Sequence, residues 1–86
     1  MRKIVFSPTA LQQLDHWKQT NPKISNRIVI LITAITESPF SGVGKPEPLK
    51  HSLHGKWSRR ITQEHRLVYE VTDSEIRILS CRFHYD

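Results

Sequence analysis

A carboxylate, a guanidinium and an imidazole, at Glu47, Arg66 and His84, could together carry out acid–base chemistry on a charged substrate. RNA can be cleaved without a metal if a base removes the 2′-OH proton, an acid protonates the departing 5′ oxygen and a cation stabilises the phosphorane. Glu47 suits the base, because Pro46 and Pro48 stiffen the backbone on either side of it. His84 suits the acid, since an imidazole can carry a proton near neutrality. Arg66 supplies the cation.

Each of these residues also has a simpler interpretation. Glu47 could be a solvated loop carboxylate, and Arg66 a surface cation at the start of a strand. His84 and Tyr85 could belong to a frayed terminus. Against this, the chain is apolar and strand-like as far as Phe83, and a terminus paired into a sheet is expected to be ordered. Residue types and spacing leave both interpretations open.

Positive charge is concentrated between Gly44 and Arg66. This stretch holds six Lys and Arg residues against Glu47 and Glu64, a net +4 out of the formal +5 of the whole chain. Such a concentration predicts a binding site for a polyanion. Five residues are expected to contact the substrate: Lys45, Lys50, Trp57, Arg59 and Arg60. Trp57 could stack on a base or, equally well, pack in the core.

Other chemistry finds less support. His51 and His54 are spaced like two metal ligands, but no further Cys or His pair completes a tetrahedral site, so neither a metal nor a cofactor is expected. Ser58 lacks the surroundings of a catalytic serine.

Length and composition limit the kinds of fold that the chain can adopt. The 86 residues suffice for one compact domain, residues 1–86, and 37% hydrophobic with 24% charged residues is typical of a globular chain. No apolar run approaches the ~20 residues of a membrane span, and the basic N-terminus is not followed by an apolar signal region. A cytoplasmic protein without membrane association is expected, and a single cysteine, Cys81, excludes an internal disulfide.

The pattern of apolar and turn residues predicts two helices and four strands. Ser7-Pro8 and Asn21-Pro22 are typical helix starts. Leu11, Leu14 and Trp17 form the expected apolar stripe of the first helix, which ends near Thr20. The second helix carries its stripe at Ile24, Ile28, Leu31, Ile32 and Ile35. Strands are predicted at Lys3 to Phe6, Lys56 to Thr62, Arg66 to Thr72 and Glu75 to Phe83, with a long loop from Ser38 to His51.

This order, β-α-α-β-β-β, predicts an α+β domain with two helices packed on a twisted, mostly antiparallel sheet. Val29, Ile30 and Ala34 widen the apolar stripe of the second helix. They indicate either a contact surface for another chain or a helix wedged between the sheet and the first helix.

Four motifs, KPEPLKH, WSRRI, EHRLVY and CRFHY, are long and uncommon. Together they resemble the YoeB toxins of the RelE/ParE superfamily, and the resemblance extends more loosely over the whole chain. It implies a RelE-like, microbial-ribonuclease-like fold and a bacterial type II toxin–antitoxin system. Such a toxin is an endoribonuclease that cuts mRNA in the ribosomal A site. The resemblance also implies a homodimer, a YefM-like antitoxin, and a toxin–antitoxin complex that binds operator DNA and represses its own operon.

By position, the resemblance assigns the general base to Glu47, the general acid to His84 and the phosphate-stabilising arginine to Arg66. It adds the C-terminal Tyr85 to the catalytic set, and Lys50 and Arg60 as supporting cations. Two other classes stay open: a basic RNA- or ribosome-binding module without chemistry, and a gyrase inhibitor like the ParE branch. The combination of base, acid and arginine speaks against both.

Overall fold

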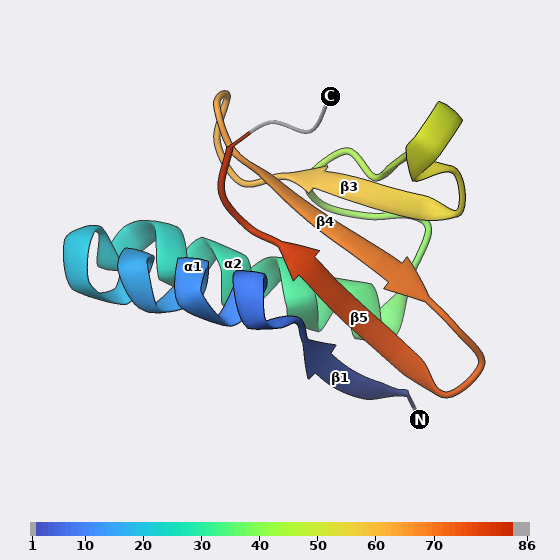
Figure 1. The fold of residues 1–86 in the computed structure, drawn as a ribbon, viewed down its shortest axis with the longest axis horizontal. Coiled ribbons are helices and arrows are strands. Elements are labelled where there is room, and N and C mark those ends of the chain that lie inside the picture. The colour runs from blue at the N-terminus through green and yellow to red at the C-terminus, as the bar shows by residue number, and fades with distance from the viewer. Residues whose placement is uncertain (1, 84–86) are drawn as a thin grey trace.

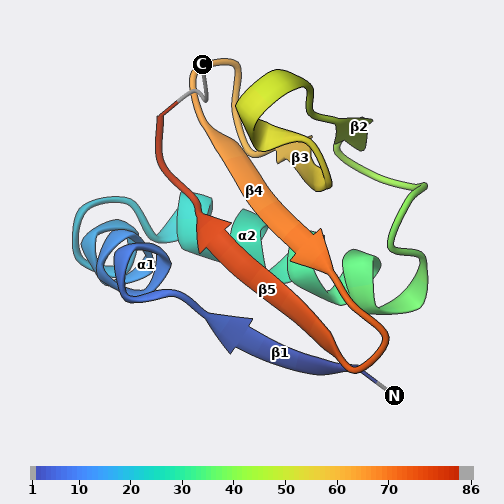
Figure 2. The same ribbon diagram turned by 45° about the vertical axis from the view of Figure 1, so that its right-hand side comes forward.

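The computed structural model describes residues 2–83 as a five-stranded sheet with two helices packed on one face (Figures 1 and 2). The elements are β1 (Lys3–Phe6), α1 (Pro8–Thr20), α2 (Pro22–Glu37), β2 (Glu47–Pro48), the short 3₁₀ helix η1 (His51–Leu53), β3 (Lys56–Arg60), β4 (Arg66–Val71) and β5 (Glu75–Ser80). The predicted α+β class and order are confirmed, with β2 as an addition. Neither of the described α-helices is long and apolar enough to cross a membrane.

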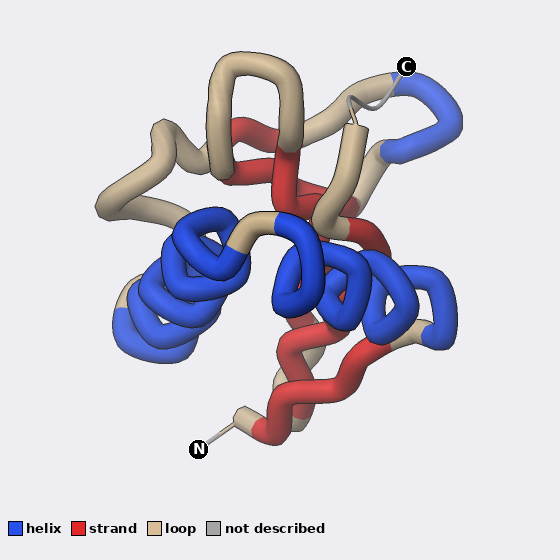
Figure 3. The backbone as a smooth tube through the Cα atoms, turned by 90° about the vertical axis from the view of Figure 1, so that its left-hand side faces the viewer, coloured by secondary structure: helices blue, strands red, loops and turns tan. Residues whose placement is uncertain are grey.

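Both helices begin where the sequence predicts. The Ser7 hydroxyl caps α1 by accepting the Ala10 N–H at 3.0 Å, and Pro8 occupies the first turn. Asn21 alone connects α1 to α2, so the two helices lie side by side (Figure 3). The expected place of Leu11 in the buried stripe of α1 is wrong, because Leu11 is 56% exposed and Ala10 takes that place.

The sheet order is β1-β5-β4-β3-β2, with β1 parallel to β5 and every other pairing antiparallel. Its covered face contributes Leu67 and Tyr69 from β4 and Ile76 and Ile78 from β5, all fully buried. The helices supply the other half of the core: Ala10, Leu14, Trp17, Ile28, Leu31, Ile32 and Ile35. The opposite face of β3 and β4 is not covered by the helices and is called the open face below.

Two segments differ from expectation. Pro46 and Pro48 exclude a central strand, but β2 lies at the sheet edge, where a missing N–H is tolerated. β5 ends at Ser80 instead of Phe83, because side chains of α1 take over the backbone of Cys81: Gln13 Oε1 accepts its N–H at 2.7 Å, and Trp17 Nε1 donates to its carbonyl at 2.9 Å. At Cys81 the chain after β5 is therefore held by α1 and not by a neighbouring strand.

Because α1 and not a neighbouring strand binds the backbone of Cys81, the Cys81 side chain points into the core. Its thiol donates to the Ala10 carbonyl at 3.5 Å. Strict alternation continued beyond β5 would turn Cys81 away from Ile76 and Ile78, but all three lie in the same core cluster. Burial raises the pKa of the Cys81 thiol to about 11.

We expect Cys81 to resist thiol reagents in the folded protein. The thiolate is the reactive form, and a pKa near 11 lowers its fraction at neutral pH on the order of 100-fold. Iodoacetamide labelling at pH 7.5, followed by mass spectrometry, should be at least that much slower in buffer than in urea. Equal rates in the two solvents would contradict the buried position.

Candidate active site

Glu47, Arg60 and Arg66 come from three neighbouring strands and share the open face of the sheet. Glu47 on β2 pairs with Ser58 on β3, and Arg60 on β3 pairs with Arg66 on β4. Directly paired residues, and residues two apart on one strand, point to the same side. The geometry of a sheet puts the Cα atoms of Glu47 and Arg66 about 12 Å apart, with the small, buried Ser58 between their strands. Long side chains can meet a phosphate across that distance.

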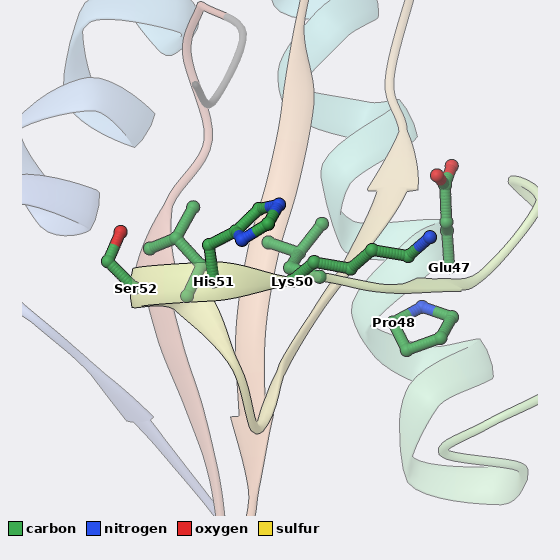
Figure 4. Close-up of a pocket in the computed structure, with 7 residues that line it drawn as sticks. Glu47, Pro48, Lys50, His51 and Ser52 are labelled. Carbon is green, nitrogen blue, oxygen red and sulfur yellow. The ribbon is translucent and has the colours of Figure 1, made fainter.

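Glu47 stands at the rim of a pocket formed by residues 47–53, with a volume of about 290 Å³. The side chain is exposed, as expected for a group that must reach a substrate. Figure 4 shows Lys50 extended along the same segment with its amine directed toward Glu47. An anion that entered here would meet a carboxylate and an ammonium group together.

Arg66 is held in one orientation by the turn that precedes its strand. Its Nη1 donates to the carbonyls of Thr62, Gln63 and His65 at 2.7, 3.0 and 3.2 Å, and the residue is only 9% exposed. A guanidinium fixed in advance by the protein can stabilise developing negative charge without reorganising during the reaction. Arg66 is therefore suited to a transition-state role.

Arg60 and Lys45 are exposed beside this site. The Arg60 N–H donates to the Gly44 carbonyl at 2.7 Å, which ties the loop before β2 to β3. Gly44 has a φ of +88°, and a Cβ at this position would lie 2.7 Å from Leu31 Cδ2. Glycine thus lets the loop lie close to α2, and the loop delivers Lys45 and Glu47 to the edge of the sheet.

Arg59 does not have the surface position expected of an RNA contact. It is fully buried, and its Nε donates to the Tyr69 hydroxyl at 3.1 Å. Its Nη atoms donate to three carbonyls of the loop after α2: Ser38 at 2.6 Å, Ser41 at 2.8 Å and Val43 at 3.1 Å. The expectation that Arg59 contacts substrate is wrong, because Arg59 lies on the covered face of β3 and no part of it reaches solvent.

Tyr69 extends this buried network. Its hydroxyl donates to the Pro39 carbonyl at 2.8 Å while it accepts from Arg59. Burial raises the pKa of Tyr69, and the hydrogen bond from Arg59 acts in the opposite direction. Arg59 and Tyr69 together hold the loop from Ser38 to Val43, which leads toward Glu47.

Trp57 also lies on the covered face. It pairs with Pro48 and Tyr69 in the sheet, packs against the core, and lies tilted against the ring of Phe40 with the centroids 4.9 Å apart. Of the two interpretations open from the sequence, packing agrees with this position. Base stacking beside Glu47 does not, since the two side chains point to opposite faces.

His84 and Tyr85, the expected acid and the C-terminal tyrosine, lie outside the described residues. The chain immediately before them is described, and Phe83 is bound to the site. Its carbonyl accepts the Arg66 N–H at 3.1 Å, and its own N–H donates to His65 Nδ1 at 2.7 Å. The described chain therefore ends beside Arg66, the arginine expected to stabilise the phosphate.

No pattern in the sequence singles out His65, which reads as a turn residue before Arg66. Its hydrogen bond to Phe83 joins residues that are 18 positions apart in the chain, and no local sequence pattern indicates a contact over such a separation. Gln13 and Trp17 likewise read as ordinary helix residues, although they bind the backbone of Cys81. The one feature of the sequence that could have pointed to His65 is that it directly precedes Arg66.

Known proteins resemble this chain over nearly its whole length. Toxin YoeB of Escherichia coli (strain K12) is 49% identical over 83 residues, which cover 96% of this chain and 99% of that protein. A solved YoeB/ParE toxin from Agrobacterium tumefaciens superposes with a TM-score of 0.94 at 41% identity and covers 99% of this chain and 100% of its own.

Two solved structures from Staphylococcus aureus are also similar. A YoeB dimer matches with a TM-score of 0.92 at 44% identity over 98% of both chains. A YoeB–YefM complex contains a chain that matches with a TM-score of 0.90 at 44% identity over 99% of both. The family model for YoeB-like toxins matches residues 6–85. The chain therefore belongs to the YoeB-like toxins of bacterial type II toxin–antitoxin systems.

Proposed function

We propose that this toxin is a ribosome-dependent endoribonuclease, an mRNA interferase that cleaves mRNA in the ribosomal A site and so inhibits translation. One observation carries the proposal: Glu47 and Arg66 share the open face, and Phe83, one peptide bond before His84, is hydrogen-bonded to the backbone of Arg66. In this proposal Glu47 as base, Arg66 as cation and His84 as acid act on one phosphate.

The chemistry needs no metal. Glu47 takes the proton of the 2′-OH, and the 2′ oxygen attacks the adjacent phosphorus. The bond from phosphorus to the 5′ oxygen breaks, and His84 gives that oxygen a proton, which leaves a 2′,3′-cyclic phosphate and a free 5′-OH. Arg66 stabilises the charge on the phosphorane oxygens, and Tyr85 completes the catalytic set.

Substrate binding is proposed for Lys45, Lys50 and Arg60. All three are exposed around Glu47 and Arg66, where cations attract the RNA backbone. The resemblance to YoeB toxins supports the ribosome as the place where the mRNA is presented. Action on ribosomes places the toxin in the cytoplasm.

Primer extension on translating ribosomes tests the proposal. Purified toxin should cleave the mRNA within the A-site codon and leave the same mRNA intact when ribosomes are omitted. Binding to ribosomes without any cleavage would favour the alternative, a basic RNA- or ribosome-binding module, which the charge of this face also supports.

We further propose that a YefM-like antitoxin neutralises this toxin, as the Staphylococcus aureus YoeB–YefM complex supports. The complex would bind operator DNA and repress its own operon. A homodimer is proposed from the Staphylococcus aureus YoeB dimer. The exposed Val29 and Ile30 on α2, at 56% and 55% exposure, provide an apolar surface for contact with another chain.

Antitoxin affinity is expected to weaken as salt is raised, because an acidic antitoxin segment would cover the cations around Glu47 and Arg66. Screening of several such pairs should lower the affinity on the order of tenfold between 0.1 and 0.5 M NaCl. Isothermal titration calorimetry at several salt concentrations measures this change. An affinity independent of salt would contradict electrostatic masking.

A further inference from the structure

The backbone of Phe83 is hydrogen-bonded on both sides. His65 Nδ1 accepts its N–H at 2.7 Å, and its carbonyl accepts the Arg66 N–H at 3.1 Å. Phe83 has a φ of +65°, in the left-handed region that residues with a Cβ disfavour. The two hydrogen bonds hold the chain in a direction that it would not otherwise prefer.

His65 is itself fixed in place. Its N–H donates to the Thr62 hydroxyl at 3.1 Å, and its ring packs edge-on against Trp17 with the centroids 4.8 Å apart. Trp17 in turn donates to the Cys81 carbonyl at 2.9 Å. Because Nδ1 accepts a hydrogen bond here, the ring proton belongs on Nε2. The acceptor atom is thus held by the turn before β4 and by α1.

Arg82 packs over the same cluster. Its guanidinium carbon lies 4.6 Å from the ring centroid of Phe83 and 5.7 Å from that of Trp17. Cations at these distances are attracted to the face of an aromatic ring. Between Cys81 and Phe83, the chain is therefore bound through backbone and side chains alike, although it belongs to no strand.

We propose that His65 is a positioning residue for the reaction: by accepting the Phe83 N–H, it fixes the direction in which the chain enters His84. This rests on the proposed function. Phe83 and His84 are joined by one peptide bond, so the backbone conformation at Phe83 constrains the position of the proposed acid, His84. Arg66 donates its own backbone N–H to the carbonyl of the same residue, which couples the acid and the phosphate-stabilising cation to one clasp formed by His65, Arg66 and Phe83.

Two substitutions separate positioning from packing. His65→Asn keeps an acceptor oxygen close to the place of Nδ1 but removes the ring. His65→Phe keeps a ring against Trp17 but has no acceptor. Packing alone predicts that the Phe variant is the better enzyme, because it keeps the aromatic contact. Positioning predicts the reverse order of activity.

We expect His65→Phe to lower the single-turnover rate of mRNA cleavage on ribosomes by about 10- to 100-fold, since small displacements of a catalytic group have effects of this size. Its affinity for ribosomes should stay unchanged. His65→Asn should keep most of the wild-type rate, even if its Tm is the lower of the two. Hydrogen exchange of the Phe83 amide should become fast in the Phe variant and stay slow in the Asn variant.

Two results would overturn the proposal: cleavage by the Phe variant at the wild-type rate, or rates that follow Tm instead of the presence of an acceptor. Amide exchange needs no catalysis, so it tests the clasp even if the wild-type toxin does not cleave mRNA. Slow exchange in the Phe variant would refute the clasp, whereas absence of cleavage by the wild type would refute the proposed function.

Discussion

Replacing Glu47 by Gln is expected to lower the rate of mRNA cleavage on ribosomes by about 10²- to 10⁴-fold. Gln has nearly the same shape as Glu, but its amide cannot take the proton from the 2′-OH. The fold should not change, because Glu47 is exposed on the edge strand β2 and forms no ion pair with any residue in the range 2–83. Loss of rate with unchanged stability would identify a chemical role.

Single-turnover primer extension with saturating toxin measures this rate, and a separate binding assay measures affinity for ribosomes. Removing a negative charge from a basic surface should not weaken RNA binding, so the loss should appear in the rate alone. Glu64→Gln is the matched control, since it makes the same change of charge at an exposed position in the turn before β4. Should both variants cleave as fast as the wild type, the base is not Glu47.

Arg59→Met is expected to reduce the free energy of unfolding by about 3–5 kcal/mol, the size of effect seen when a buried polar network loses one member. Met fills a similar volume but cannot donate the four hydrogen bonds that reach Tyr69 and three loop carbonyls. A domain of this size has only about 5–15 kcal/mol of stability in total. The loss should therefore lower the midpoint of urea unfolding markedly.

Arg60→Met gives a direct comparison, because it makes the same chemical change one residue later at an exposed position. Its effect on stability should stay within about 0.5 kcal/mol, as for other surface substitutions. Arg60→Met should instead weaken binding to ribosomes. If Arg59→Met were as stable as the wild type, the network around Arg59 would contribute nothing to the fold.

No ion pair within residues 2–83 neutralises Arg59, and its acceptors explain how the charge is tolerated. The Ser38 carbonyl directly follows α2, and the C-terminal end of a helix carries partial negative charge that favours a cation. Arg59→Lys should also destabilise the protein, because one ammonium group cannot reach acceptors arranged around a planar fork.

Much of the fold follows from local patterns. Ser7-Pro8 and Asn21-Pro22 predict both helix starts, since side-chain capping and the fixed φ of proline act within a few residues. The strands predicted to end at Thr62 and Thr72 end at Arg60 and Val71, so both turns begin within two residues of their predicted places. The exceptions, Leu11 and the end of β5, depend on where α1 lies against the sheet, which no window of neighbouring residues contains.

The sequence by itself determined the residue types of the site, namely a carboxylate between two prolines, an arginine at a strand start and an imidazole near the terminus. Tertiary structure decided which of two adjacent arginines is buried. Alternation puts Arg59 and Arg60 on opposite faces, but only the helices packed on one face make Arg59 a buried scaffold residue and leave Arg60 exposed. The bond between His65 and Phe83 was beyond prediction for the same physical reason: the pairing of β4 with β5 brings the turn before β4 close to the chain after β5, and spacing along the chain does not record it.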